Sequence, residues 1–347
     1  MKKHLSRPCS CAKRTLSLLL AAVMLFGLGA CSAKDASSYD PDQADHGPKI
    51  VCTTYPICDW AKQILGDAAE ECQLVLLGGS GVDLHSYQPS VADIAAIASC
   101  DLFFYVGGES DEWVEDALAI DHKDTRAAFS LMEILEERLK EEEHKEGMQE
   151  EAHGHGAEHE ADPEHEEDPE YDEHVWLSLK NAEICVEKMT EAISALMPDK
   201  AAGFAQNAAS YGVKLQELDS RFATAVEAAP QKTLLFGDRF PFRYLVDDYG
   251  LDYYAAFAGC SSETAASFET VIFLAGKMDE LQLPAVCILE DSDGALANTI
   301  RQASTAKDQT VVTFDSLQSV TAADIAAGKT YLSAMENNLK ALQDALR

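Results

Sequence analysis

Short apolar, β-branched runs alternate with helix-forming segments along the chain, and this alternation limits the fold more than any other feature. In the first half, the apolar runs are Lys49–Tyr55, Cys72–Leu77 and Leu102–Val106, and helical spacing separates them at Asp59–Leu65 and Val91–Ser99. Strands that alternate with helices predict parallel β/α units, because each helix carries the chain back over the sheet.

The same pattern returns after residue 230. The expected strands are Thr233–Phe236, Tyr253–Phe257 and Ala285–Leu289, and the expected helices are Phe242–Tyr249, Phe268–Leu281 and a helix from Ala295. The sequence therefore predicts the α/β class, with two lobes of parallel β-sheet flanked by helices, in residues 49–180 and 230–347. The length of 347 residues and the 47% hydrophobic content agree with two domains that each bury a core.

Residues 181–229 lack the strand and helix alternation of the two lobes. Ala182–Leu196 and Asp199–Ala228 are nearly continuous helix formers, and Pro198 is well placed to begin a helix. About 30 helical residues span about 45 Å at 1.5 Å per residue. We therefore expect a long, rigid helical connector, which would restrict hinge opening between the lobes.

The N-terminal residues 1–30 contain five Lys and Arg and no acid, followed by the apolar run Leu16–Leu28. This pattern predicts a secretory signal peptide. The run ends in Leu-Gly-Ala-Cys, which resembles the bacterial lipobox, so cleavage would leave Cys31 as the lipid-modified first residue. The polar residues 31–48 are then expected to form a flexible tether between the bilayer and the protein.

The formal net charge of −33 would repel phosphate backbones, which argues against nucleic acid as a partner. The acids concentrate in residues 133–173, where 19 Asp and Glu stand against three Lys and Arg. We expect this low-complexity segment to form an acidic loop without a core. Five of the ten histidines lie in it, which predicts auxiliary metal contacts because neutral imidazole binds borderline cations. They are His144, His153, His155, His159 and His165.

Seven cysteines remain after Cys9, Cys11 and Cys31 are set aside, and the odd number leaves at least one free thiol if the others pair. Most of the seven lie in apolar surroundings, where a small buried thiol is the default interpretation. No CxxC pair indicates a cysteine metal site or a redox motif.

Two histidine motifs follow predicted strands, where α/β sheets place their ligand sites. The first, GVDLHSYQPS, contains His85, and the second, DEHVWL, contains His174 and directly follows the acidic segment. Together with TTYP at the first strand and the order of the elements, these motifs resemble the metal-binding lipoproteins of zinc and manganese ABC importers. The resemblance covers residues 47 to 347 and is most specific at the two histidines.

That resemblance implies one divalent ion between the lobes, bound by two histidines of the first lobe, a third ligand after the long helix and a late carboxylate. His85 and His174 match the pair. Glu290 best matches the late carboxylate, with Asp291 and Asp293 as less favoured substitutes.

The third ligand departs from the family pattern, because the segment Leu235–Leu245 contains no histidine. Alignment places Arg239 at the ligand position, but a guanidinium that is always protonated cannot coordinate a cation. Asp238 is the expected replacement. Arg239 would instead hold a carboxylate such as Glu263 or Asp238 near the site. An Asp238–Arg239 structural turn is the alternative.

Two imidazoles with one or two carboxylates suit four-coordinate Zn(II), whereas more oxygen ligands would favour Mn(II). The resemblance links His-rich loops to zinc-specific members. We therefore expect a lipid-anchored receptor on the extracytoplasmic face of the cell membrane that captures Zn(II) and delivers it to an ABC permease. Capture of Mn(II) or Fe(II) is the alternative, followed by a metal-storage or adhesin lipoprotein. A secreted zinc hydrolase is disfavoured, because the sequence contains neither HExxH nor GxSxG.

Overall fold

The structure is a computed structural model that describes residues 47–78, 81, 84–120, 126–149, 170–261 and 265–347. The predicted signal peptide at 1–30, Cys31 and nearly all of the tether at 31–48 lie outside these residues. So do Glu263 and four of the five clustered histidines, His153, His155, His159 and His165. Within the described part of the chain, no helix is both long and apolar enough to cross a membrane.

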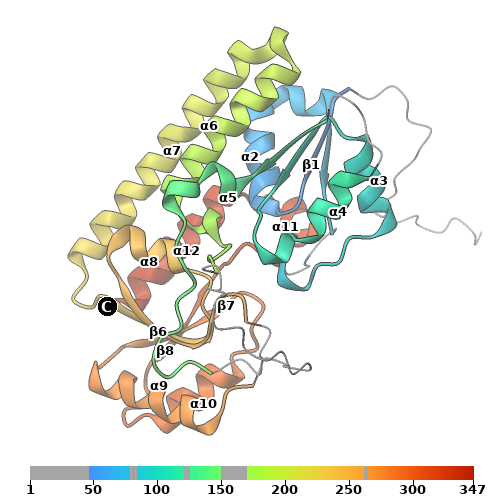
Figure 1. Ribbon diagram of the computed structural model, residues 1–347. Coiled ribbons are helices and arrows are strands. Elements are labelled where there is room, and N and C mark those ends of the chain that lie inside the picture. The colour runs from blue at the N-terminus through green and yellow to red at the C-terminus, as the bar shows by residue number, and fades with distance from the viewer. Residues whose placement is uncertain (1–46, 79–80, 82–83, 121–125, 150–169, 262–264) are drawn as a thin grey trace, which may run out of the picture. The chain divides into compact units, whose positions relative to one another are not determined.

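The first sheet is parallel and has the strand order β2-β1-β3-β4 (Figure 1). Its strands are β1 (Lys49–Cys52), β2 (Gln73–Leu76), β3 (Leu102–Tyr105) and β4 (Ala127–Ser130). The helices of this lobe are α2 (Tyr55–Leu65), α3 (Val91–Ser99), α4 (Trp113–Ala119) and α5 (Leu131–Ile134), with the 3-10 turns η1 (Gly66–Glu71), η2 (Leu84–Ser86), η3 (Glu109–Asp111) and η4 (Glu136–Arg138). The predicted β/α alternation is confirmed here.

The second sheet is also parallel, with the order β6-β5-β7-β8. Its strands are β5 (Thr233–Arg239), β6 (Asp252–Phe257), β7 (Ala285–Leu289) and β8 (Thr310–Phe314). Its helices are α8 (Arg243–Tyr249), α9 (Phe268–Glu280), α10 (Ala295–Ala303) and α12 (Tyr331–Ala345), whereas the short helix α11 (Ala322–Ala326) lies beside the first sheet (Figure 1). The two central strands of each sheet are therefore buried between helices, as parallel sheets require.

The connector consists of two helices that lie side by side (Figure 1). Helix α6 (Leu179–Leu196) follows the turn η5 (Val175–Leu177), and the turn η6 (Pro198–Lys200) leads into α7 (Ala201–Ala228). Pro198 thus starts a helical segment, as the sequence predicts. At 1.5 Å per residue, the 28 residues of α7 span about 42 Å.

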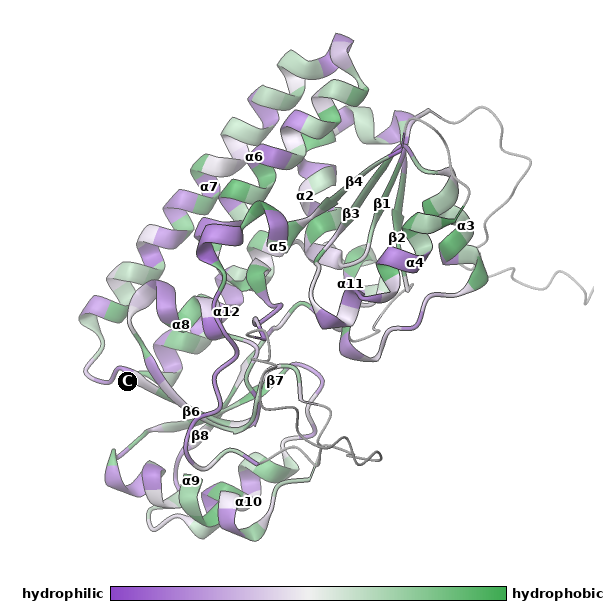
Figure 2. Cartoon of the chain, viewed as in Figure 1, coloured by the Kyte–Doolittle hydropathy of each residue, from purple (hydrophilic) through white to green (hydrophobic). Residues whose placement is uncertain are grey.

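The largest core cluster joins residues of both sheets through α2, α6, α7 and α12. Apolar residues line the sheets and the facing sides of these helices (Figure 2). Tyr331, at the start of α12, is fully buried; its ring packs on Trp60 at 5.1 Å and its hydroxyl donates to the carbonyl of Trp176 at 2.7 Å. The C-terminal helix therefore fixes the segment that carries the second histidine motif.

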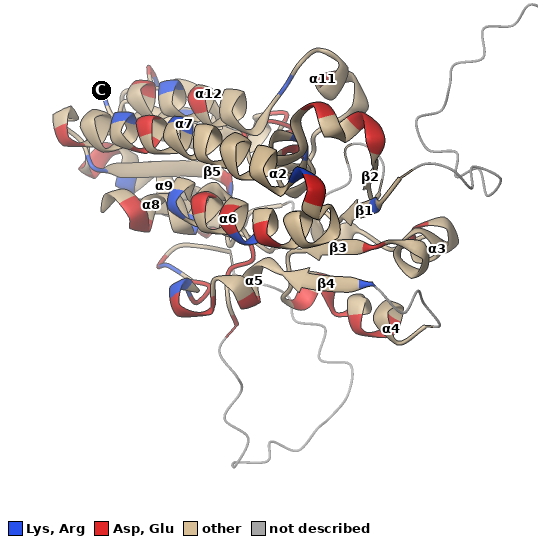
Figure 3. Ribbon diagram, turned by 90° about the horizontal axis from the view of Figure 1, so that it is seen from above, with Lys and Arg blue, Asp and Glu red and all other residues tan. Residues whose placement is uncertain are grey.

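The first half of the acidic segment is better ordered than the sequence suggests. Leu135 is buried, and Leu139 and Met148 pack against the main core. Residues 141–149, here called the acidic stem, run along the second sheet, where the Gln149 amide donates to the Ala256 carbonyl at 2.8 Å. The expectation of a loop without any core is therefore wrong for this half, because scattered apolar residues anchor it. Asp and Glu also lie along α6 and α7 (Figure 3), so the acids are not confined to this segment.

Two local predictions need correction. The strand predicted through Tyr55 ends at Cys52, and Pro56 lies in the first turn of α2, where its missing N–H costs no hydrogen bond. The sequence reading also omitted β4, β8 and α12, although Thr310–Phe314 and Tyr331–Ala345 carry clear strand and helix patterns.

Candidate metal centre

His85 lies on η2, in the loop that follows β2, and the buried Leu84 beside it anchors the turn. Its Nδ1 is 2.8 Å from Ser110 Oγ and 3.5 Å from a carboxylate oxygen of Glu173. A proton on Nδ1 donates to Ser110 Oγ, with the Glu173 carboxylate nearby, and leaves the lone pair of Nε2 to face the site.

His174 is fully buried and precedes η5. Asp172 Oδ1 accepts from the backbone amide of His174 at 2.9 Å and lies 3.0 Å from its Nδ1. This contact places the ring proton on Nδ1. The Nε2 atoms of His174 and His85 then lie 3.1 Å apart. Two imidazole nitrogens at 2.0–2.1 Å from one tetrahedral Zn(II) are about 3.3 Å apart, so the pair is nearly arranged for coordination.

Glu173 sits behind the histidine pair. Its Oε1 accepts from the Ser110 amide at 2.8 Å, a contact that depends on Gly108, since a Cβ there would lie 2.4 Å from that oxygen. Gly108 also has φ +84°, which a glycine adopts without strain. Burial raises the pKa of Glu173 to about 7, against the lowering effect of the Ser110 hydrogen bonds. Glu173 therefore supports His85 rather than facing solvent.

Cys260 is the third member of the site. Within the described ranges, one group of three or more His, Cys, Asp or Glu residues can hold a metal, and it consists of His85, His174 and Cys260 with all ligand atoms within 4.8 Å. Burial raises the pKa of the Cys260 thiol well above its usual range, and the nearby Asp172 and Glu142 carboxylates raise it further. Sequence reasoning missed this residue, although it follows a strand of the second sheet at the edge where ligand sites gather.

Asp238 is not in this group. It lies near the end of β5, where the β5–β6 register shifts between Phe236 and Arg239. Its Oδ1 accepts from the Arg239 amide at 2.9 Å and its Oδ2 from the Leu289 amide at 3.2 Å. The carboxylate thus joins the ends of β5 and β7, which agrees with the structural turn that the sequence leaves as the alternative.

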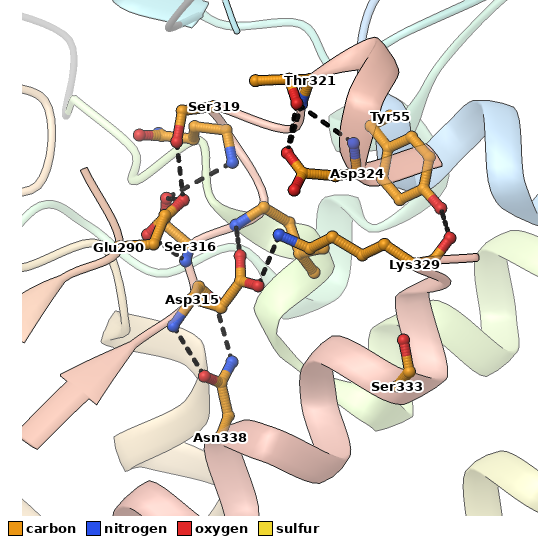
Figure 4. Close-up of polar contacts among 12 residues, drawn as sticks. Tyr55, Glu290, Asp315, Ser316, Ser319, Thr321, Asp324, Lys329, Ser333 and Asn338 are labelled. Atoms are coloured by element: carbon orange, nitrogen blue, oxygen red, sulfur yellow. Dashed lines mark hydrogen bonds and ion pairs between the residues drawn. The ribbon is translucent and has the colours of Figure 1, made fainter. Parts of the chain in front are cut away.

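Glu290 follows β7 and is also outside the group of three. Its oxygens accept from the Ser316 amide and hydroxyl, each at 2.8 Å, and from the Ser319 hydroxyl at 3.1 Å (Figure 4). Burial raises its pKa, and the neighbouring Asp315 adds to this effect. The same loop carries Gln318, whose Nε2 is 3.5 Å from His85 Nε2. Glu290 is therefore linked to the site through the loop 316–319.

The other predicted site residues lie elsewhere. His144 is exposed on the acidic stem, and Arg239 pairs with Phe257 in the β5–β6 ladder. All seven described cysteines have free thiols: Cys52, Cys58, Cys72, Cys100, Cys185, Cys260 and Cys287.

Two parallel α/β lobes, helices that join them, and an imidazole pair on loops near the strand ends define a metal-binding protein of the solute-receptor type. The family model described as "Zinc-uptake complex component A periplasmic" matches residues 50–345. The chain belongs to this family, which consists of metal-transport components and not of enzymes.

Relatives support the assignment. The chain is 34% identical over 334 residues to "Zinc-binding lipoprotein AdcA" of Streptococcus pneumoniae, a match that covers 95% of this chain and 60% of that protein. It is 28% identical to "High-affinity zinc uptake system protein ZnuA" of Bacillus subtilis, over 96% of this chain and 98% of the relative. It thus spans about 60% of the length of the streptococcal relative.

Among solved structures, the chain is similar to the Zn(II)-bound ZnuA-like domain of Streptococcus pneumoniae AdcA. The TM-score is 0.66 at 30% identity, and the match covers 86% of this chain and 99% of that domain. The fold that the sequence predicts is therefore that of the family.

Proposed function

We propose that this protein captures Zn(II) at His85 and His174 and delivers it to an ABC permease. The single observation that carries the proposal is the 3.1 Å separation of the two Nε2 atoms, each on a ring whose Nδ1 faces an acceptor. Imidazole pairs held in this way are typical of zinc sites, in which outer acceptors fix the ring orientation.

Zn(II) fits the site better than Mn(II), the alternative from the sequence. The three groups that converge are two nitrogens and one sulfur, whereas manganese favours oxygen ligands. The names of the relatives support the same ion, since both the streptococcal and the Bacillus protein are described as zinc proteins. Glu290 stays a proposed fourth ligand, which would have to leave Ser316 and Ser319 to reach the ion.

The protein would act by binding and release rather than by catalysis. Lipid attachment through Cys31 would hold it on the extracytoplasmic face of the membrane, within reach of the permease. The acidic, His-rich segment 133–173 would collect Zn(II) weakly, with His144, His153, His155, His159 and His165 as auxiliary ligands.

Calorimetric titration of the metal-free protein with Zn(II) tests the proposal. His85→Ala and His174→Ala should each lower the affinity of the tight site by orders of magnitude, because each removes one metal bond. The matched control is His144→Ala, which truncates an exposed histidine outside the group. An unaltered titration of His85→Ala would remove His85 from the site. Growth of a deletion strain under zinc chelation separates transport from storage.

A further inference from the structure

The third ligand position of the metal site has no histidine in the segment where the family resemblance expects one. The structure brings a thiol to the imidazole pair instead: Cys260 Sγ and the ligand atoms of His85 and His174 all lie within 4.8 Å of one another. The three residues come from three separate places in the chain: η2, the loop before η5, and the loop after β6.

The backbone is built to bring this cysteine close. Gly259 passes directly beside the second histidine motif, where a Cβ would lie 3.2 Å from His174 Cε1 and 3.2 Å from Asp172 Oδ2. The same Cβ would lie 2.9 Å from the Phe240 carbonyl oxygen, so a larger residue would push the turn away from His174. The Cys260 amide then donates to Glu142 on the acidic stem at 3.1 Å. The second histidine motif on one side and the acidic stem on the other therefore hold the turn at Gly259 and Cys260 in place.

The distances suit a shared ion. In a tetrahedral site with Zn–N of about 2.0–2.1 Å and Zn–S of about 2.3 Å, a nitrogen and a sulfur lie about 3.6 Å apart. The three ligand atoms lie within 4.8 Å of one another, and the two nitrogens are 3.1 Å apart. The side chains therefore need to move only slightly to bind one shared metal ion. Asp238 is not in this group, and its two oxygens accept from the backbone amides of Arg239 and Leu289.

We propose that Cys260 is the third metal ligand, so that the cargo site of this protein has two histidines and one thiolate. This inference rests on the proposed function, since it names the ligand set of the same site. On binding, the thiol proton passes to solvent and a sulfur–metal bond forms, with no change in oxidation state. A thiolate favours Zn(II) and the softer Cd(II), and it disfavours Mn(II), which prefers oxygen.

The test uses the full chain with Co(II) as a spectroscopic probe, followed by Zn(II) competition against a chelator. Bound Co(II) should show a near-ultraviolet sulfur-to-metal charge-transfer band in the native protein and in Cys58→Ser. Cys58→Ser is the matched control, because Cys58 is a partly buried cysteine outside the group of three. Cys260→Ser should lose the band, and its Zn(II) affinity should fall at least tenfold.

Cys260→His provides a second variant in case the serine protein does not fold. It should bind Zn(II) and Co(II) tightly but without the charge-transfer band. The inference is overturned if the native protein binds Co(II) tightly without the band, or if Cys260→Ser keeps its Zn(II) affinity while His174→Ala loses it. That second pattern leaves the proposed function intact. Failure of the native protein to bind Zn(II) or Co(II) tightly would overturn both proposals.

Discussion

Asp172 and His174 are joined twice, because one carboxylate oxygen lies 2.9 Å from the backbone nitrogen of His174 and 3.0 Å from its ring Nδ1. The two residues are only two positions apart, so the Asp-Glu-His motif orients its own imidazole. The hydroxyl of Tyr244 donates to the Asp172 carbonyl at 2.8 Å and holds the motif on the second lobe. His174 therefore presents its Nε2 in one direction before any metal arrives.

Asp172→Asn should weaken Zn(II) binding about 10- to 100-fold, the usual effect of losing an outer acceptor of a metal-bound histidine. The amide can still accept from the backbone of His174, but it no longer holds the ring proton with a full charge. Competition with a zinc chelator measures the change. Asp219→Asn is the control, since Asp219 on helix α7 is a partly buried carboxylate that accepts a hydrogen bond from Tyr249 outside the metal site. An equal loss in both variants would contradict a specific role for Asp172.

Asp238→Asn separates the ligand predicted from the sequence from the structural contact observed here. We expect Zn(II) affinity within about twofold of the native value, because the carboxylate already accepts from the amides of Arg239 and Leu289. Stability should fall by about 1 kcal/mol, since a neutral amide offers one acceptor where the carboxylate offers two. Urea denaturation of the metal-free protein measures this. A large loss of affinity without loss of stability would restore Asp238 as a ligand.

The sequence predicts the fold well because strand and helix patterns are local. The alternation and the helix formers after Ala182 correctly indicate two parallel sheets and the α6–α7 connector. The histidine pair also follows from local motifs. Cys260 could not be found in this way, because its role depends on Gly259 packing against His174, 85 positions earlier in the chain. From the sequence, a cysteine near a strand is interpreted as a core residue, and only the three-dimensional structure shows the distant imidazole beside it.

Replacing residues 151–168 with a Gly/Ser linker should remove the weak Zn(II) sites and leave the tight site unchanged. The acidic stem is kept in this design because Lys145 pairs with Asp252 and Gln149 bonds to Ala256. Calorimetry should show fewer bound ions at the same tight affinity. A matched full-length variant with His153, His155, His159 and His165 changed to Asn separates imidazole binding from the effect of the acids. An unchanged stoichiometry in the linker variant would contradict auxiliary binding by the loop.

The buried Asp111 should make stability depend on pH in the acidic range. Its Oδ2 accepts from the amides of Val106 and Gly107, each at 2.9 Å, yet burial dominates and raises its pKa from 3.8 to about 6. Between these two values the folded protein binds more protons at this group than the unfolded chain does. The free energy of unfolding therefore falls as pH rises from about 4 to about 6, by up to about 3 kcal/mol, and this contribution is constant above that range.

Asp111→Asn isolates this contribution, since the amide keeps an oxygen acceptor for the two backbone amides but does not titrate. Urea denaturation with a chelator present measures the unfolding free energy of both proteins. As pH rises from 4 to 6, the value for the native protein should fall relative to the value for the variant. A chelator is needed because bound metal would add its own stabilisation. A pH-independent difference would show that Asp111 is ionised equally in both states, and a difference of opposite slope would show that its hydrogen bonds outweigh its burial.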